Sequence, residues 1–458
     1  MHTPATAQHD NAALATRHAL DGLFRRNYGQ LVATLTRIFG PRHLDLVEDI
    51  VQETLLKALG QWAYHGLPTN PTGWLYRVAR NGALDALRRE RTLSGKIDLL
   101  ASQLTDAFPD TATPRHPDDP EGRDDRLRDD QLRLIFGCCH PDLSREAQIA
   151  LTLKTLLGFG VPEIARAFLV PAPTIAQRLV RAKRTIRERD LAFTIPVAAA
   201  LPARLDAVLA VLYLLFNEGY TAHSGPALTR QDLCADAIRL CSILAAAPVG
   251  DTPRVHALLA LFLLQASRLP ARTDEGGALL TLTEQDRARW DRRLIVAGLR
   301  SLRRAAAGDA LTTYHLQAEI AACHALAPTH AATDWRRILV AYDTLAHLDH
   351  SPLILLNRAV ALAEVAGAEA ALDEVARLLR APTLARYPLA HATHADLHRR
   401  RGDLPAAHAA YGVALTLTTN PTERRFLERQ LRAVAPDAGG TSTRPCEGRQ
   451  TETAAGRQ

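Results

Sequence analysis

Side-chain types that are able to form hydrogen bonds with DNA bases are concentrated between residues 172 and 189. This stretch holds six basic residues and one acid. Arginine and glutamine can each form paired hydrogen bonds with a guanine or an adenine edge. On a helix that turns about 100° per residue, the apolar side chains share one arc. They are Ile175, Leu179, Ala182 and Ile186, whereas Gln177, Arg181 and Arg184 point the opposite way and Thr174 and Arg178 lie at the flank. The pattern predicts a helix with one packed face and one DNA-reading face.

The residues before this helix predict the elements that position it. A short helix is expected over 162–168, then a turn that contains Pro171 and Pro173, then a longer helix from about Thr174. Two helices joined by a short turn form the helix-turn-helix, whose second helix enters the major groove. The alternative is an ordinary helical hairpin with a solvated basic face.

A second arginine-rich helix is predicted over 71–91. Trp74, Leu75, Val78 and Ala79 share one side of it. The other side is polar and basic, and it forms a stripe suited to DNA phosphates. Its members are Arg77, Arg80, Asn81, Arg88 and Arg91.

An acidic helix is predicted just upstream, over 43–62. Val47, Val51 and Leu55 share its apolar face. We expect the acidic and amide side chains to cluster on another face, which suits a basic partner helix. They are Glu48, Asp49, Gln52 and Glu53. Taken alone, this pattern is equally typical of an acidic face that is only exposed to solvent.

Composition predicts an all-α protein of several domains. The 458 residues are 47% hydrophobic and only 5% aromatic, and alanine and leucine dominate; such residues favour helices. Six cysteines in so long a chain indicate a reducing compartment rather than a disulfide framework. The sequence shows no secretory signal and no apolar run of membrane-spanning length, so we expect a cytoplasmic protein.

Charge and helical patterning divide the chain into six parts. The net charge is +6, but the acids gather between Asp98 and Asp130, where ten acids face four arginines. We predict an N-terminal tail (1–19), a helical unit (20–92), an acidic flexible linker (93–130), a second helical unit with the helix-turn-helix (131–190), a helical domain (195–435) and a disordered tail (436–458).

These motifs resemble those of sigma-70 family transcription initiation factors. The helix-turn-helix is similar to sigma region 4, on the residues Glu163-Ile164-Ala165, Thr174 and Arg181-Ala182-Lys183-Arg184. The helix over 71–91 is similar to regions 2.3 and 2.4, on Trp74-Leu75, Ala79-Arg80-Asn81, Asp85 and Arg88-Arg89. Residues 43–62 resemble region 2.2. No segment resembles region 1.1 or region 3, and that is the layout of the extracytoplasmic-function (ECF) subgroup.

The resemblance implies a function and a set of partners. Region 2.2 would bind the β′ clamp helices of core RNA polymerase through the acidic face, and the β flap of the polymerase would be a second contact. The helix over 71–91, with the loop before it at 63–70, would engage the −10 promoter element and hold an extruded base, whose unstacking costs a few kcal/mol. The second helix of the helix-turn-helix would read the −35 element. RNA polymerase supplies the chemistry, so we expect no enzyme activity of the chain itself.

The domain over 195–435 contains a degenerate repeat. Gly367 and Gly402 each begin a similar helical segment at an offset of 35 residues, near the period of about 34 residues of TPR repeats. Residues 333–352 match the second helix of a preceding unit. FNEGY at 216–220, LCADAIRL at 233–240 and LNRAVA at 356–361 resemble the ECF subgroup with a TPR-like extension. We therefore expect an α-solenoid that contacts the sigma regions and modulates their activity, with the strongest basic cluster of the chain outside it.

Other constellations give no catalytic or metal site. Cys138-Cys139-His140 is expected to be a packed turn, and His391, His394 and His398 an exposed helix face rather than a zinc site. Asp286, Trp290, Asp291, Gln317, Glu319 and His324 interrupt apolar helices; we expect hydrogen bonds between helices there, the alternative being a ligand groove. No cofactor is predicted. Two other functions stay open: a one-component helix-turn-helix regulator with a ligand-sensing helical domain, and an enzyme or metalloprotein in the C-terminal half.

Overall fold

A computed structural model describes residue 24 and residues 27–89, 97–107, 121–168, 170–220, 228–274, 279–308 and 310–435. Every regular element in these residues is helical, and the one β feature among them is an isolated bridge between Thr273 and Leu279. The all-α expectation is confirmed. The predicted tails, 1–19 and 436–458, lie outside the described residues.

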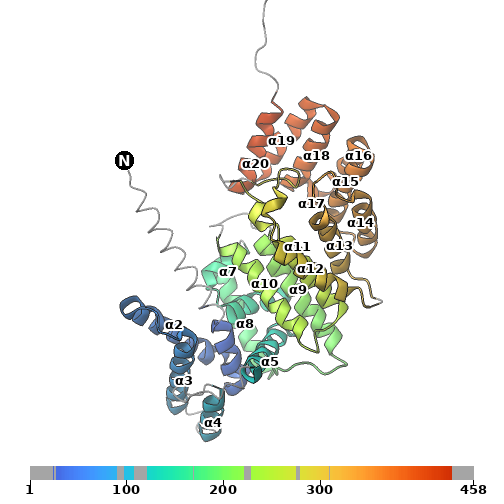
Figure 1. Cartoon of the computed structure of the whole chain (residues 1–458). Coiled ribbons are helices and arrows are strands. Elements are labelled where there is room, and N and C mark those ends of the chain that lie inside the picture. The colour runs from blue at the N-terminus through green and yellow to red at the C-terminus, as the bar shows by residue number, and fades with distance from the viewer. Residues whose placement is uncertain are drawn as a thin grey trace, which may run out of the picture. The chain divides into compact units, whose positions relative to one another are not determined.

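The chain folds into two compact units (Figure 1). Unit 1 contains residues 1–270 and 286–326, and unit 2 contains 271–285 and 327–458. The single helical domain predicted over 195–435 is therefore divided between two units. Its first helices share a unit with the two predicted sigma regions, because they pack against the same core.

Unit 1 begins with the helices of the region 2 segment. Residues 27–39 are helical, followed by η1 (Pro41–His43), α2 (Leu44–His65) and α3 (Pro71–Arg89). Val47, Val51 and Ala58 of α2 are fully buried, and α2 packs on α3. Gly66 ends α2 with a φ of 74°, a backbone conformation that favours glycine.

The predicted linker over 93–130 contains helical structure, which corrects the expectation of a flexible connector. Helix α4 (Ile97–Ala107) packs on α3, and α5 (Glu121–Cys138) begins inside the acidic stretch. Leu100 and Leu104 of α4 are buried at helical spacing. The acid count concealed this apolar stripe, because the burial of a few leucines is enough to anchor a short amphipathic helix.

The region 4 segment follows as α5, α6 (Arg145–Leu157), α7 (Val161–Ala167) and α8 (Ala172–Glu188). Ser144 caps α6 by accepting a hydrogen bond from the Ala147 amide, as serine does at helix N-termini. Gly158 ends α6 with a φ of 71°. Helices α7 and α8 pack on each other and on α6, so the predicted helix-turn-helix is present.

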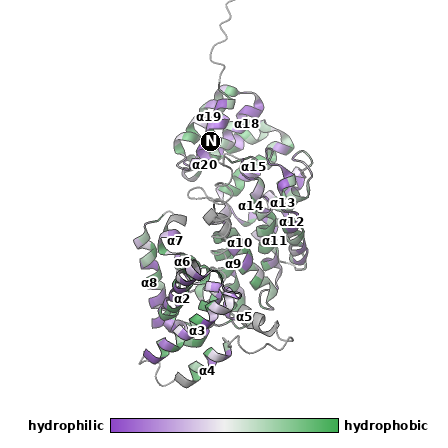
Figure 2. Ribbon diagram, turned by 60° about the vertical axis from the view of Figure 1, so that its left-hand side comes forward, coloured by the Kyte–Doolittle hydropathy of each residue, from purple (hydrophilic) through white to green (hydrophobic). Residues whose placement is uncertain are grey.

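Five further helices complete unit 1: α9 (Leu201–Tyr220), α10 (Leu228–Ala246), α11 (Pro253–Ala266), α12 (Arg292–Ala305) and α13 (Thr313–Leu326). Short 3-10 turns lie at η3 (Leu269–Ala271) and η4 (Arg287–Arg289). Helix α11 is hydrophobic along nearly its whole length (Figure 2) and packs against α10, α12 and α13. A helix that is apolar all round belongs in a core, so α11 is the centre of this bundle.

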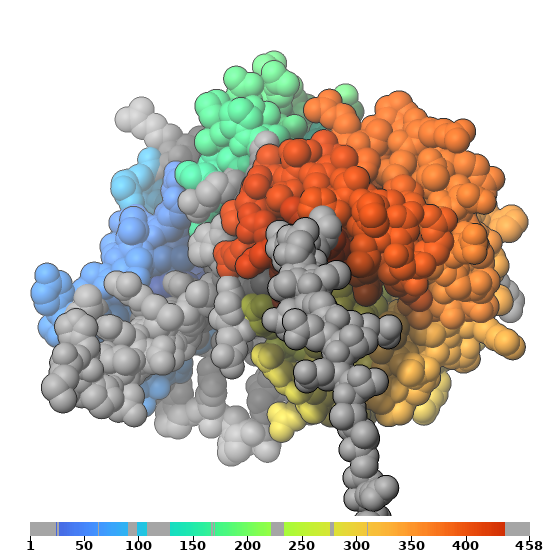
Figure 3. Space-filling view, turned by 90° about the horizontal axis from the view of Figure 1, so that it is seen from above, coloured from blue at the N-terminus to red at the C-terminus, as the bar shows by residue number. Residues whose placement is uncertain are grey.

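Unit 2 is a stack of antiparallel helices. Its members are α14 (Trp335–Leu348), α15 (Pro352–Ala366), α16 (Ala368–Leu378), α17 (Pro382–Ala385), α18 (Pro388–Arg401), α19 (Leu404–Leu417) and α20 (Pro421–Ala433). Most of them pack on their neighbours in sequence, and Figure 3 shows them as one surface, from orange to red. Gly367 lies between α15 and α16 and Gly402 between α18 and α19, with φ values of 91° and 88°. The α15–α16 and α18–α19 hairpins are the two repeats that the sequence pattern indicates.

No helix within the described ranges is long and apolar enough to cross a membrane.

Candidate nucleic-acid and polymerase interfaces

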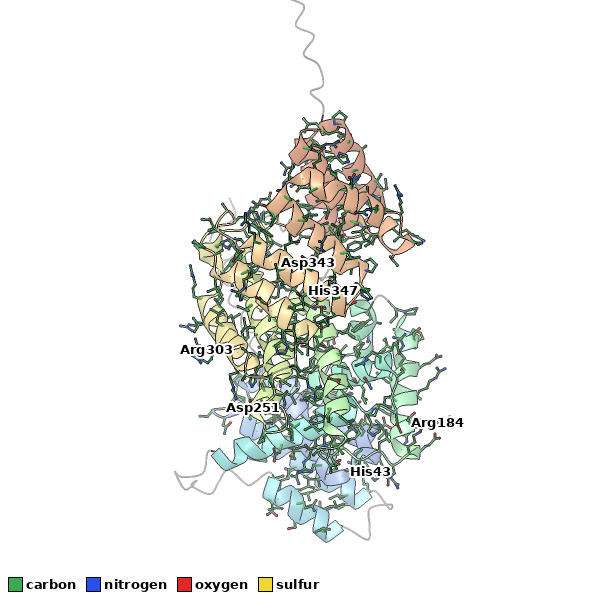
Figure 4. The ribbon with its side chains drawn as sticks, turned by 90° about the vertical axis from the view of Figure 1, so that its right-hand side faces the viewer. His43, Arg184, Asp251, Arg303, Asp343 and His347 are labelled. Atoms are coloured by element: carbon green, nitrogen blue, oxygen red, sulfur yellow. The ribbon has the colours of Figure 1, made fainter. Side chains whose placement is uncertain are left out.

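Helix α8 separates a buried apolar face from an exposed polar face. Ile175, Leu179, Ala182 and Ile186 are all buried, as the helical projection predicts. Gln177, Arg181 and Arg184 are exposed, and Thr174 and Arg178 are half-buried at the flank. Arg184 points away from the ribbon in Figure 4 and forms a 2.6 Å ion pair with Glu188 one turn later. The exposed face presents donors that match guanine and adenine edges.

Helix α3 has the same two-sided construction. Leu75 and Ala79 are buried, and Trp74 and Val78 are half-buried beside them. The polar side is largely open: Arg77, Asn81 and Arg88 are exposed, whereas Arg80 is half-buried. Arg91 lies outside the described residues. Trp74 packs edge-on against Trp62 of α2, with ring centroids 5.4 Å apart, so aromatic contacts fix the start of α3 against the end of α2.

Tyr64, at the end of α2, is 89% exposed and His65 beside it is exposed too. Leu67 follows in the loop and is exposed as well. An exposed aromatic ring beside a basic helix is suited to stacking on a nucleic-acid base.

The predicted acidic face of α2 requires a correction. Asp49, Gln52 and Glu53 are exposed, but Glu48 is only 3% exposed and does not belong to the open face. Leu56, 67% exposed, lies next to the exposed acids at helical spacing. The helical projection placed Glu48 with its neighbours because it could not show that another segment of the chain covers this turn.

That segment is α8. Glu48 accepts hydrogen bonds from Lys183 Nζ at 3.0 Å and from the Thr155 hydroxyl at 3.2 Å. Lys183 also contacts Asp45 at 2.6 Å, and Arg187 reaches the other oxygen of Asp45 at 2.6 Å. Burial disfavours the charge on Lys183, yet Glu48 and Asp45 raise the pKa of its ammonium group. Likewise burial opposes ionisation of Asp45, but Lys183 and Arg187 lower the pKa of the carboxyl.

A glycine allows a second close contact between the two sigma-like segments. A Cβ atom added to Gly29, on the helix over 27–39, would lie 2.2 Å from the Leu156 carbonyl oxygen of α6. No side chain fits at that distance. Beyond the other end of this helix, Arg42 and Asp190 form an exposed ion pair at 2.7 Å. The region 2 and region 4 segments are thus packed against each other. Sequence reasoning missed Asp45 and Lys183 because nothing local in the sequence marks a contact across 138 residues.

The first helices of the extension pack on region 4. Helix α9 contacts α5 and α6, and α10 contacts α5. Arg204 donates a hydrogen bond to the Phe136 carbonyl at 2.5 Å, and Arg145 donates one to the Ala207 carbonyl at 3.0 Å. These two arginines connect α9 to the helices that carry the helix-turn-helix.

The other polar constellations have structural partners. Cys138 and Cys139 are buried, and burial raises the pKa of the Cys139 thiol to about 12, so this thiol stays protonated at neutral pH. Within the described ranges, no group of three histidine, cysteine, aspartate or glutamate side chains is arranged to hold a metal ion. His391, His394 and His398 are half-buried rather than exposed, and His391 bonds the Ala385 carbonyl.

The unusual polar residues of the extension mostly act as caps and interhelical bonds. Asp286 caps η4 and Asp291 caps α12. Gln317 of α13 accepts a 3.0 Å hydrogen bond from Tyr213 of α9. Trp290 is buried with the guanidinium groups of Arg268 and Arg287 within 5.4 Å of its ring centroid. The Tyr213–Gln317 bond is of the interhelical kind that we expected, whereas Asp286 and Asp291 cap their own helices. His324 is buried, and its carbonyl accepts a bond from Arg287.

Comparisons with known proteins agree with this geometry. Residues 23–92 match the model of sigma-70 region 2, residues 133–186 match sigma-70 region 4, and residues 204–306 match a family of unknown function, DUF6596. The ECF RNA polymerase sigma-E factor of Haemophilus influenzae is 28% identical over 174 residues, which are 38% of this chain and 88% of that protein. The sigma-E factor of Escherichia coli K12 is 29% identical over 143 residues, 31% of this chain and 71% of that protein.

One relative extends over almost the whole chain. The uncharacterized protein R00370 of Rhizobium meliloti is 38% identical over 409 residues, which cover 89% of this chain and 94% of that protein. The shared length includes the extension as well as the sigma regions. The chain therefore belongs to the same family as R00370, and it carries regions 2 and 4 of the sigma-70 family in that order.

Proposed function

We propose that this protein is an RNA polymerase sigma factor of the ECF type, which brings core RNA polymerase to promoters and carries a TPR-like extension that modulates this activity. The observation that carries the proposal is the shared construction of α3 and α8. Each buries an apolar stripe and exposes arginine or amide side chains, and each lies in a segment that matches a DNA-binding region of the sigma-70 family.

In this proposal each surface has one task. The exposed acids of α2, Asp49 and Glu53 with Gln52, bind the basic clamp helices of β′, and the neighbouring Leu56 adds apolar area to the contact. Helix α3 and the residues around Tyr64 engage the −10 element. Helix α8 reads the −35 element through Thr174, Gln177, Arg178, Arg181 and Arg184.

The extension modulates the factor through the helices that share unit 1. Lys183 faces Glu48 and Asp45 of α2 while Arg204 and Arg145 connect α9 to region 4. The close packing of region 2 on region 4 is one arrangement, and we propose that polymerase selects another in which they separate. A signal shifts this equilibrium only if it binds the two arrangements with different affinity.

The test is transcription reconstituted from purified core polymerase and the full chain, on a library of DNA fragments. Start sites that share −35 and −10 elements are expected only when the chain is added. Initiation no higher than that of core polymerase alone would overturn the proposal. Promoter binding without any need for polymerase would point to a one-component regulator.

The role of the extension is tested by variants rather than by truncation. Removing the chain after Asp190 would uncover the apolar face of α5 and α6 on which α9 packs, so a change in output could reflect misfolding. Arg145→Ala with Arg204→Ala loosens the same contact and keeps the core. A change in transcript yield relative to the wild-type chain, in either direction, supports modulation. Equal yield at matched protein levels would show that this contact of the extension does not affect transcription.

A further inference from the structure

Helix α12, in the extension, carries an arginine face that the proposed function does not use. Residues 287–304 hold seven arginines and one acid, whereas the equally long stretch 172–189 around α8 holds six basic residues and one acid. Our expectation that the strongest basic cluster lies outside the extension was therefore wrong. Averaging charge over a long helical domain hides a cluster confined to a short stretch, here η4 and α12.

The fold places these arginines on one side of α12. Ile295, Gly298, Ser301 and Ala305 are buried, and a Cβ at Gly298 would lie 2.8 Å from the Leu264 side chain of α11, so this side packs closely on α11. On the other side five arginines are exposed, four of them besides the paired Arg304, and Arg303 extends outward in Figure 4. We call these four, Arg292, Arg293, Arg300 and Arg303, the α12 arginine face.

No acidic side chain in the part of the chain that the structure describes forms an ion pair with this face. The adjacent Arg304 differs, since it pairs with Asp251 at 2.7 Å. Arg300 and Arg303 are three residues apart, a spacing at which like charges destabilise a helix. Arg292 and Arg293 lie in the first turn, where the helix dipole disfavours cations. The stability of α12 therefore does not explain the face, and a bound polyanion would relieve both effects.

Duplex DNA is the polyanion whose dimensions and chemistry fit. Eleven residues of helix separate Arg292 and Arg303, which is about 16 Å. A duplex carries a phosphate about every 3.4 Å along each strand, so about five phosphates per strand lie within that length. All four cations are arginine, whose fork of donors binds phosphate oxygens in pairs.

The position of α12 brings this face near DNA whenever region 4 is bound. Helix α12 packs on α11, α11 packs on α9 and α10, and these contact α5 and α6 of region 4. Arg303 and Arg184 lie toward opposite edges of Figure 4. The DNA on α12 is therefore a different segment from the one that α8 reads.

We infer that the α12 arginine face is a second DNA-binding surface, which contacts the phosphates of a duplex segment outside the −35 and −10 elements without reading its sequence. The inference rests on the proposed function in one respect only, that the function brings unit 1 to duplex DNA. Each arginine that neutralises a phosphate releases bound counterions, so the surface strengthens binding in a strongly salt-dependent way.

The experiment measures binding of the full chain to a fluorescent duplex that lacks promoter elements, by anisotropy between 50 and 200 mM salt. The variant changes the whole face, as Arg292→Gln, Arg293→Gln, Arg300→Gln and Arg303→Gln. A matched control changes four exposed arginines of unit 2 by the same total charge: Arg336→Gln, Arg377→Gln, Arg380→Gln and Arg386→Gln. A third protein carries lysine at the four α12 positions and keeps the charge.

Four phosphate contacts contribute about −3.6 to the slope of log affinity against log salt. Wild-type affinity should therefore fall about 100-fold more across this salt range than that of the α12 glutamine variant. The unit 2 control should keep the wild-type slope, and the lysine variant should recover most of it. Circular dichroism should give equal helix content for all four proteins, because every altered side chain is exposed.

Equal slopes for the α12 variant and the unit 2 control, or no binding of the wild-type chain at 50 mM salt, would overturn the inference. Loss of core polymerase capture by the α12 variant, with its DNA slope unchanged, would assign the face to an acidic protein surface and overturn it as well. The transcription assay separates the two proposals. Normal initiation with an unchanged slope refutes only the second surface, and α12-dependent DNA binding without initiation refutes only the sigma activity.

Discussion

Arginines act differently in α8 and in unit 2. Arg184 of α8 pairs with Glu188 of the same helix, and both side chains are more than half exposed. Arg358 of α15 instead joins three helices: it contacts Asp343 of α14 at 2.6 Å and Glu374 of α16 at 2.8 Å, and it is only 26% exposed.

The two settings have different energetic consequences. An exposed pair within one helix contributes only about 0.3–0.5 kcal/mol, so Arg184 can exchange Glu188 for DNA at little cost. A half-buried arginine between two carboxylates from different helices holds the helices in register, and its loss leaves two carboxylates without a cation. Arginines that are exposed and pair only within their own helix are thus available to a partner. Arginines that pair with acids of other helices hold the fold together instead.

The acids of α2 provide the strongest test of this distinction. Asp49→Lys with Glu53→Lys should reduce capture of core polymerase below detection, because like charges at a docking surface cost several kcal/mol. The melting temperature should stay within a degree or two of wild type, since both side chains are exposed. A pull-down with core enzyme measures the first effect and thermal unfolding the second.

The control for this pair is Glu369→Lys with Asp373→Lys, two exposed acids of α16. It makes the same charge change in unit 2 and should leave capture of polymerase intact. Recovery of core enzyme by the α2 variant would show that the docking face is misassigned.

Breaking the unit 2 network should act on stability alone. Arg358→Gln is expected to lower the free energy of unfolding by about 2 kcal/mol, below the range for a fully buried pair because the site is partly solvated. Denaturant unfolding monitored by circular dichroism measures this effect. Arg380→Gln, at an exposed site in the same unit, should change stability by less than about 0.5 kcal/mol. If the two variants were equally stable, the network would have no structural role.

The α8 arginines should give the opposite result. Arg181→Ala and Arg184→Ala are each expected to weaken binding of the holoenzyme to a selected promoter by about 1–3 kcal/mol if they contact bases. Each should change folding stability by less than about 0.5 kcal/mol. Titration of promoter DNA with holoenzyme provides the measurement, with Arg336→Ala as the matched substitution. Promoter affinity unchanged in both α8 variants would remove the assigned orientation of this helix.

The smallest expected effect concerns pH. Burial, followed by the charges of His398 and His391, lowers the pKa of His394 to about 4. The unfolded chain then binds a proton that the folded chain does not, so stability is full above pH 6.5 and declines as pH falls toward 4. We expect a loss of about 1 kcal/mol after allowance for partial solvation. His394→Asn should flatten this dependence in unfolding curves at pH 7 and pH 5; an unchanged slope would exclude His394 as its source.

Much of the fold and the exposed polar side of α8 follow from sequence, because periodicity is a local property. Ile175 to Ile186 fall in one arc of α8, and Gly367 and Gly402 each lie between the two helices of a repeat hairpin. Helix α4 was missed because two buried leucines are a weak signal within a run of acids. Arginines of the α12 face could have been found by counting charge helix by helix.

Contacts between distant segments could not be predicted. The sequence pattern of α2 predicts that Glu48 and Asp49 are equally exposed. Only the fold shows that Lys183 and Thr155 cover Glu48 and leave Asp49 exposed. The same limit applies to the division of the extension, since nothing in the sequence of α9 to α13 marks that these helices belong to unit 1.

The burial of Glu48 also sets an order of events during synthesis. Its cation, Lys183, lies 135 residues further along the chain. At about 5–20 residues per second, a ribosome needs roughly 7–27 s to cover that distance. Throughout this interval the newly made α2 presents Glu48 and Asp45 to water, and the close packing at Gly29 has no partner either. Region 2 therefore emerges from the ribosome uncovered, and the contact with region 4 is added to it afterwards.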